Sequence, residues 1–345
     1  MCIVCEYHES PNKEQYLELK NIRCDRCDVL QEIPTEFVKL KDIVCNECRN
    51  LKLINLPINL ETINCSGCDS ITSISNKLYN IRILIFTCCD NLQDIPKEFV
   101  NLKILGVSWC KKIRYIPDEL INLEELCCQG CPIIEIPKTL VNLRELCCHD
   151  CKEIKEIPKE LVNLEEIVCV ECLGLSEISG EYTKLTFLDC SNCNFTEIPL
   201  IKSLEHLICC GCDKLKEINN GLSELKTLEC VDCHQISGIP FQSSNLEEID
   251  CSFCNNLVDI SGLNSLKKIW CMGCPNLTFV SSYDCVKLGS LETIEANYQK
   301  YRKKACKKFL DTIFEELVTI TWEPTRAKNW CWDEDEKKFM NEWLM

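Results

Sequence analysis

The sequence is poor in the residues on which many nucleotide-binding and catalytic motifs depend. Only 11 of its 345 residues are glycine, and none of them is followed by lysine. A phosphate-binding P-loop needs a Gly-Lys pair after a glycine-rich turn, so this class of nucleotide site is excluded. The 4 histidines lie outside any metalloprotease motif and outside any nucleophile elbow. We therefore expect a protein without a catalytic centre, not an enzyme.

The sequence also lacks long apolar runs and an excess of positive charge. No stretch reaches the roughly 18 apolar residues that a membrane span requires, and the chain does not begin with a basic segment followed by an apolar one. The 38 basic residues are outnumbered by 54 acidic ones, which gives a formal net charge of -16. Such a surface repels phosphate backbones and anionic lipids. We predict a cytoplasmic protein that binds neither nucleic acid nor membranes.

Cysteine, in contrast, is abundant and periodic. The chain has 33 cysteines, and most of them occupy two positions, three residues apart, that recur about every 21 residues. The first position, called here the first slot, is filled by Cys24, Cys45, Cys65, Phe86, Val107, Cys128, Cys148, Cys169, Cys190, Cys209, Cys230, Cys251 and Cys271. The second slot is filled by Cys27, Cys48, Cys68, Cys89, Cys110, Cys131, Cys151, Cys172, Cys193, Cys212, Cys233, Cys254 and Cys274. A fixed period of this length is typical of stacked repeats.

Each repeat follows the consensus L-x-x-L-x-C-x-x-C-x-x-L-x-x-I-P-x-x-L-x-x-L, which is plain between Leu143 and Leu164. From about residue 17 to 280 the chain resembles the leucine-rich repeat family, with Cys replacing one strand Leu and the family's Asn. The resemblance implies short strands whose leucine-type residues point inward and whose other residues face a concave surface. The expected fold class is therefore α/β, a leucine-rich repeat solenoid or horseshoe with a parallel concave sheet. It should contain about 13 units of about 21 residues.

The ends of the chain differ from the repeats, so we predict three segments. These are an N-terminal cap at residues 1–20, the solenoid at residues 21–285 and a helical C-terminal cap at residues 286–345. Apolar residues spaced by three and four from Leu291 to Leu317 predict an amphipathic helix in the last segment. Both caps should cover the apolar edges that an open solenoid leaves at its ends.

The tail contains the sequences WEPTR at residues 322–326 and NWCWD at residues 329–333. It is similar to a C-terminal segment of proteins from giant DNA viruses of amoebae, which also encode Cys-rich leucine-rich repeats of this kind. The similarity implies a viral protein, located in the host cell cytoplasm or in the virion.

Pairs of cysteines three residues apart are also typical of zinc and iron–sulfur sites. Both slots are core positions of the repeat, however, and free cysteine packs as a small apolar residue. Phe86 and Val107 fill the first slot in two repeats, which suits packing and does not suit metal binding. We therefore expect no cofactor. A metal or iron–sulfur protein that uses the ladder of slots is the alternative.

Outside the slots, Cys127 and Cys147 occupy the same outward position in adjacent repeats, and His149 lies two residues beyond Cys147. Thiolates and imidazole bind soft metals, so this trio is a second metal candidate. A disulfide between the two thiols is another interpretation. Ordinary surface thiols, with no metal, are the interpretation that we favour.

The expected function depends on the outward strand positions, most of which are polar or acidic. The apolar exceptions, our candidates for partner binding, are Ile83, Ile85, Ile104, Trp109, Val168, Val170, Phe187 and Trp270. Exposed apolar clusters rimmed by charge mark contact sites, and tryptophan is enriched among residues that dominate binding energy. We predict a non-enzymatic protein–protein interaction scaffold whose concave face binds a protein partner. A structural virion component is a further alternative, and the C-terminal tail or a second copy of the chain is an alternative occupant of the patch.

Overall fold

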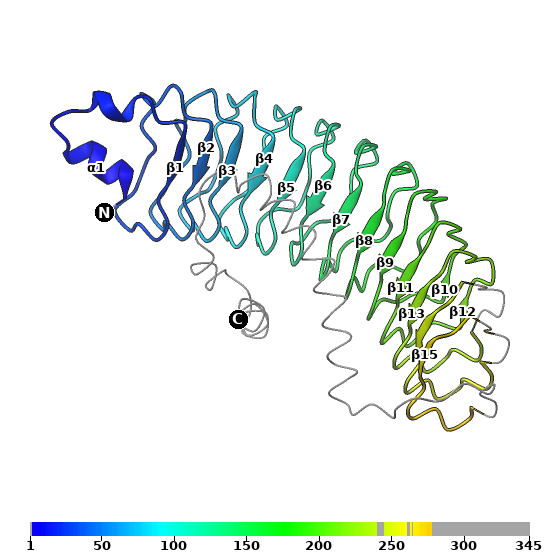
Figure 1. The fold of residues 1–345 in the computed structure, drawn as a ribbon. Coiled ribbons are helices and arrows are strands. Elements are labelled where there is room, and N and C mark those ends of the chain that lie inside the picture. Colours follow the sequence, from blue (N-terminus) through cyan, green and yellow to red (C-terminus); the bar gives the residue numbers. More distant parts are fainter. Residues whose placement is uncertain (1, 240–244, 261–262, 264, 278–345) are drawn as a thin grey trace. The chain divides into compact units, whose positions relative to one another are not determined.

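The structure is a computed structural model that describes residues 2–239, 245–260, 263 and 265–277. It divides into two compact units, whose described parts are residues 2–132 and residues 133–277. Within each unit the chain winds as a parallel-sheet solenoid, in which every turn adds one short strand beside the strand of the turn before (Figure 1). The predicted solenoid class is thus confirmed. The predicted C-terminal cap at residues 286–345 lies outside the described residues.

The first unit begins with helix α1 (Ile3–Glu9) and the short 3-10 helix η1 (Glu14–Tyr16). Helix α1 contacts the first strand (Figure 1). The strands of this unit follow one another in sequence order as β1 (Asn21–Arg23), β2 (Asp42–Val44), β3 (Thr62–Asn64), β4 (Ile83–Ile85), β5 (Ile104–Gly106) and β6 (Glu125–Cys127).

The second unit has the same design with one addition. Its main sheet consists of β7 (Glu145–Cys147), β8 (Glu166–Val168), β9 (Phe187–Asp189), β11 (His206–Ile208), β13 (Thr227–Glu229), β14 (Glu248–Asp250) and β15 (Lys268–Trp270). A second, two-stranded parallel sheet forms from β10 (Glu197–Ile198) and β12 (Glu217–Ile218). No helix among the described residues is both long enough and apolar enough to span a membrane.

Each strand pairs with its neighbour at an offset of one repeat, so that residues at the same repeat position lie side by side. Leu84 pairs with Ile63 on one side and with Leu105 on the other, and all three side chains are fully buried. Successive residues of a strand point to opposite faces, so the central residue of each strand enters the core and its two neighbours lie on the outward face. Because every turn repeats this arrangement, the core is a continuous stack of aliphatic side chains.

Each strand other than β10 and β12 is followed by a sharp turn with a left-handed residue directly before the second slot. This backbone conformation occurs at Arg26, Glu47, Gly67, Cys88, Trp109, Gly130, Asp150, Glu171, Asn192, Gly211, Asp232, Phe253 and Gly273. It costs a residue other than glycine about 1–2 kcal/mol. Backbone hydrogen bonds to the next turn offset this cost, as where the Trp109 N–H donates to the Gln129 carbonyl at 2.6 Å.

The second-slot cysteines do more than the packing that we expected of them. Eleven of them donate a thiol hydrogen bond, at 2.6–3.2 Å, to the carbonyl of the first-slot residue in the turn before. One example is Cys110, whose Sγ lies 2.8 Å from the Phe86 carbonyl oxygen. A buried carbonyl without a partner would destabilise the fold, so the thiol supplies a donor that a purely aliphatic residue could not.

Candidate functional site: the outward face of the strands

The first group of predicted binding residues lies on the outward face of β4 and β5. Ile83 and Ile85 flank the core residue Leu84, and Ile104 pairs with Ile83 on the next strand. We expected these side chains to be exposed, and this is wrong: their exposed fractions are 4%, 2% and 3%. Each lies in a column of paired residues, with Ile83 held between Thr62 and Ile104, and neighbours at strand spacing cover one another. Their predicted role in partner binding stays a prediction.

Trp109 is only partly buried and occupies the left-handed turn position, with a φ of 62°. Its ring lies against the next turn: a Cβ built on Gly130 would be 2.2 Å from Trp109 Cε3. Gly130 thus leaves the space that the indole occupies. The indole Nε1 is buried and has no hydrogen-bond partner among the described residues. A buried donor without an acceptor costs stability.

The second predicted group is brought together by the structure. Val168, Val170 and Phe187 form one buried cluster on β8, β9 and the turn after β8. Ile208 of β11 completes the cluster, and Cys147 and Cys210 pack against it. The sequence analysis had not included Ile208 among the binding residues. The signal was present, because Ile208 stands one repeat beyond Asp189 in the column of paired residues that also contains Val168. Like the first group, these residues are buried and not exposed, and the pairing of neighbouring strands is again a cause.

Trp270, the last predicted binding residue, is at the end of β15 and is partly buried. It pairs with Asp250 and is not a member of the Val168 cluster. The predicted residues of the second unit therefore form a cluster and one separate aromatic residue.

Carboxylates occupy the same outward column in the second unit. Asp189, Glu229 and Asp250 are 2%, 9% and 4% exposed, and Glu229 pairs directly with Asp250. Burial raises the pKa of Asp250, although Ser252 donates its backbone N–H to Asp250 Oδ1 at 3.1 Å. Two adjacent carboxylates in a poorly solvated column favour a cationic partner group, which would relieve their mutual repulsion.

The structure does not describe the three candidate metal ligands as one site. Cys127 belongs to the first unit, where its Sγ lies 3.1 Å from Ser108 Oγ, whereas Cys147 and His149 belong to the second. Cys147 packs against the Val168 cluster. A metal site at this trio stays the untested alternative to ordinary thiols.

Three buried first-slot thiols of the second unit are poor metal ligands. Cys148, Cys169 and Cys209 fill the first slot, and each is hydrogen-bonded to the second-slot thiol of the next turn. That hydrogen bond, and then burial, raise the pKa of each of these three thiols well above the ordinary value. Metals bind thiolates, and these groups are held as neutral thiols. At these three positions the chemistry favours packing over metal binding.

A groove that the sequence analysis had not identified lies on the arcs of the first unit. Its volume is about 940 Å³, and its lining includes Val38, Ile54 and Ile58. These three side chains are 58%, 58% and 62% exposed, in contrast to the buried residues of the strand face. Val38 and Ile58 stand one repeat apart, in a periodic column of exposed apolar residues that continues in the sequence with Tyr79 and Val100. The signal was therefore present in the sequence.

Residues 184–202, in the second unit, match the family model described as Leucine Rich Repeat. This match supports the resemblance to that family over one turn of the solenoid. A search of curated proteins finds no relative of the chain.

Solved structures are similar in fold. The functional domain of InlJ from Listeria monocytogenes, described as including a cysteine ladder, has a TM-score of 0.49 and 20% identity; the alignment covers 76% of this chain and 63% of InlJ. The chain therefore spans less than two thirds of that structure. YopM from Yersinia enterocolitica has a TM-score of 0.48 and 17% identity, with 77% of this chain and 69% of YopM covered. The leucine-rich repeat ectodomain of the receptor kinase GASSHO1/SCHENGEN3 from Arabidopsis thaliana, in complex with CASPARIAN STRIP INTEGRITY FACTOR 2, has a TM-score of 0.37 and 18% identity over 73% of this chain and 38% of its own.

Proposed function

We propose that the protein is a non-enzymatic scaffold that binds a protein partner on the outward face of its strands. The observation that supports this proposal is the separation of roles within each turn. The central strand residue and the two slots build the core, while the flanking residues differ in chemistry from strand to strand, as Ile83, Glu166 and His206 do at one position. Stacked repeats of this kind present extended binding surfaces.

The proposed partner presents both apolar and basic side chains. Trp109 offers a partly exposed aromatic ring in the first unit, and the partly exposed Cys147 and Cys210 border the Val168 cluster in the second. The column that contains Glu229 and Asp250 adds negative charge, in keeping with the formal net charge of -16. Basic groups on the partner would increase the association rate and fix its orientation.

We also propose an intracellular site of action, in the cytoplasm of an infected host cell or within a virion. This proposal depends on the resemblance of the tail to proteins of giant DNA viruses. Detection of the chain in purified particles by mass spectrometry would make it a structural virion component. Its presence only in the soluble fraction of infected cells would favour the cytoplasmic scaffold.

The binding proposal is tested by placing a photoreactive phenylalanine at position 109 and cross-linking in cells of the native host. The control places the same group at Phe253, which has the equivalent turn position and lies over Gly273 as Trp109 lies over Gly130. We expect one dominant cross-linked protein from position 109. With that protein purified, Trp109→Ala should weaken binding at least about tenfold, which is about 1.4 kcal/mol, and Phe253→Ala should not. Equal affinity of the Trp109→Ala variant and the unmodified chain would contradict the proposed surface.

A further inference from the structure

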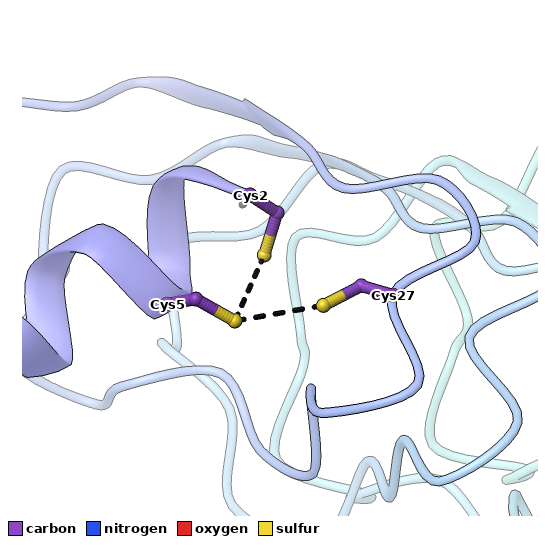
Figure 2. A group of neighbouring side chains, drawn as sticks. All are labelled: Cys2, Cys5 and Cys27. Carbon is purple, nitrogen blue, oxygen red and sulfur yellow. Dashed lines mark hydrogen bonds between the residues drawn. The ribbon is translucent and has the colours of Figure 1, made fainter.

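Three thiols meet at the start of the first unit, outside the part of the ladder that packs as core. The Sγ atoms of Cys2, Cys5 and Cys27 all lie within 4.8 Å of one another. Cys5 Sγ is 3.5 Å from Cys2 Sγ and 3.5 Å from Cys27 Sγ. Figure 2 shows the three side chains converging from α1 and from the turn that follows β1.

This spacing is that of ligands around one tetrahedral ion. A zinc–sulfur bond of about 2.3 Å places neighbouring thiolates about 3.8 Å apart, close to the separations seen here. Thiolates around a four-iron cluster bind different irons and lie further apart, so the geometry favours a single ion. Three sulfur ligands, in turn, suit zinc better than calcium or magnesium.

Cys27 differs from the other second-slot cysteines because it belongs to the first turn of the solenoid. In later turns the second-slot thiol donates to a carbonyl of the turn before, as Cys48 does to Cys24. Before the first turn comes α1 instead, and the Cys27 sulfur lies beside Cys5 of that helix. In the first turn, the second-slot cysteine therefore contributes its thiol to a cluster and not to the packing between turns.

Cys24 is the candidate for the fourth ligand, although its Sγ is not one of the three that lie within 4.8 Å of one another. It fills the first slot of the same turn, and its side chain interacts with that of Cys2.

The sequence spacing agrees with this arrangement. Cys2-x-x-Cys5 and Cys24-x-x-Cys27 are two knuckles separated by 18 residues, within the range of structural zinc sites. A zinc–thiolate centre carries net negative charge, which would be costly to bury deep in the ladder. Cys2, Cys5 and Cys27 are partly exposed to solvent, which stabilises that charge, whereas Cys24 is buried.

We propose that Cys2, Cys5, Cys24 and Cys27 bind one zinc ion that ties α1 to the first turn of the solenoid. An open solenoid needs its terminal core covered, and α1 alone is short, with 7 residues. A zinc ion held jointly by the helix and the first turn would fix the helix over the end of the stack. The binding free energy of the metal then contributes directly to folding.

The proposal is tested on the full chain, without a metal-binding tag and purified without chelators. Elemental analysis should find one zinc per chain, and cobalt added to the metal-free protein should produce the visible bands of tetrahedral thiolate coordination. Cys5→Ser and Cys27→Ser should each lose the zinc, whereas Cys88→Ser, which removes a comparably exposed cysteine, should retain it. Circular dichroism of each variant establishes that the solenoid is folded.

A second measurement does not depend on the variants. A chelator should lower the melting temperature of the unmodified chain and leave that of Cys5→Ser unchanged. Zinc retained by folded Cys5→Ser, iron in place of zinc, or a protein without metal in which two of Cys2, Cys5 and Cys27 are joined in a disulfide would each overturn the proposal.

Discussion

The indole of Trp109 lies over Gly130, so closely that a single added carbon on Gly130 would lie 2.2 Å from Trp109 Cε3. The two residues occupy the same left-handed position in consecutive turns, with φ values of 62° and 65°. An aromatic ring on one turn therefore requires the absence of a side chain on the next. Phe253 and Gly273 repeat the relationship in the second unit.

The first prediction concerns this pair. Gly130→Ala should destabilise the protein by about 2–4 kcal/mol, since the left-handed backbone costs about 1–2 kcal/mol for alanine and the clash with the indole adds a cost of overpacking. Denaturant-induced unfolding followed by circular dichroism measures the change. In the Trp109→Ala background the clash is absent, and the same glycine substitution should cost only the backbone component. Equal costs in the two backgrounds would show that the ring does not depend on Gly130.

The second prediction separates the two cysteine slots. Cys233 Sγ donates to the Cys209 carbonyl at 2.9 Å, and both side chains are fully buried. Cys209→Val should change the free energy of unfolding by less than about 1 kcal/mol, because first-slot Val107 shows that the position accepts valine and the carbonyl is unaffected. Cys233→Val should cost about 1–3 kcal/mol, because it leaves that buried carbonyl without its donor. Thermal and denaturant unfolding of the two variants, compared side by side, would contradict the assignment if Cys209→Val were the more damaging.

The repeat was predictable because its physical cause acts locally. Every turn must bury one aliphatic stripe, so positions such as Leu84 and Leu105 recur with the period of the turn and set the strand register. The left-handed turn residues were not predictable. Only four of the thirteen are glycine, and Trp109 is among the least expected residue types for that conformation. Hydrogen bonds between turns stabilise them, and these cannot be seen in one repeat alone.

The candidate sites were predictable only in part. Periodicity identified which residues share the outward face, and it placed Val168, Val170 and Phe187 together correctly. It did not predict their burial, which depends on the side chains of neighbouring strands. The thiol cluster was missed for a different reason: Cys24 and Cys27 fill the two slots of the first repeat, so the period alone accounts for them. Their proximity to Cys2 and Cys5 depends on how α1 packs on the first turn.

The third prediction concerns pH. Burial raises the pKa of Asp250 in the folded protein above its value of about 3.9 in an unfolded chain. The folded state therefore binds the proton more tightly, and the stability that this gives is complete below the unfolded pKa and is lost as the pH rises through the folded pKa. Asp250→Asn should remove this loss, so the variant should be more stable than the unmodified chain at neutral pH and similar to it in acid. Unfolding curves between pH 4 and pH 8 measure the difference.

Glu247 is the matched control, because its pKa is shifted in the opposite direction to that of Asp250. Its exposed carboxylate is 2.8 Å from Lys267, and that hydrogen bond lowers its pKa. The stability that it contributes is present above the unfolded pKa and is lost as the pH falls through the folded pKa. Glu247→Gln should therefore weaken the protein slightly at neutral pH and not in acid. A gain in stability at neutral pH for Glu247→Gln, or a loss for Asp250→Asn, would show that burial and pairing do not act as assigned.

The last prediction uses two adjacent cysteines as each other's control. Cys88 is the left-handed turn residue and is partly exposed, whereas the next residue, Cys89, fills the second slot and is fully buried. The Cys89 thiol donates to the Cys65 carbonyl at 3.1 Å, and burial raises its pKa well above the ordinary value.

An alkylating reagent attacks the thiolate, and a raised pKa lowers the thiolate fraction at pH 8, so Cys89 is protected both by access and by protonation. We expect Cys88 to be alkylated in the native protein on the order of a thousandfold faster than Cys89, which reacts only when the turn opens. Fragment ions of the shared peptide separate the two positions in tandem mass spectrometry. In denaturant the two rates should become similar, because the difference belongs to the fold and not to the local sequence. Rapid alkylation of Cys89 in the native protein would mean that the ladder is open to solvent, and its thiols would then be available for metal binding after all.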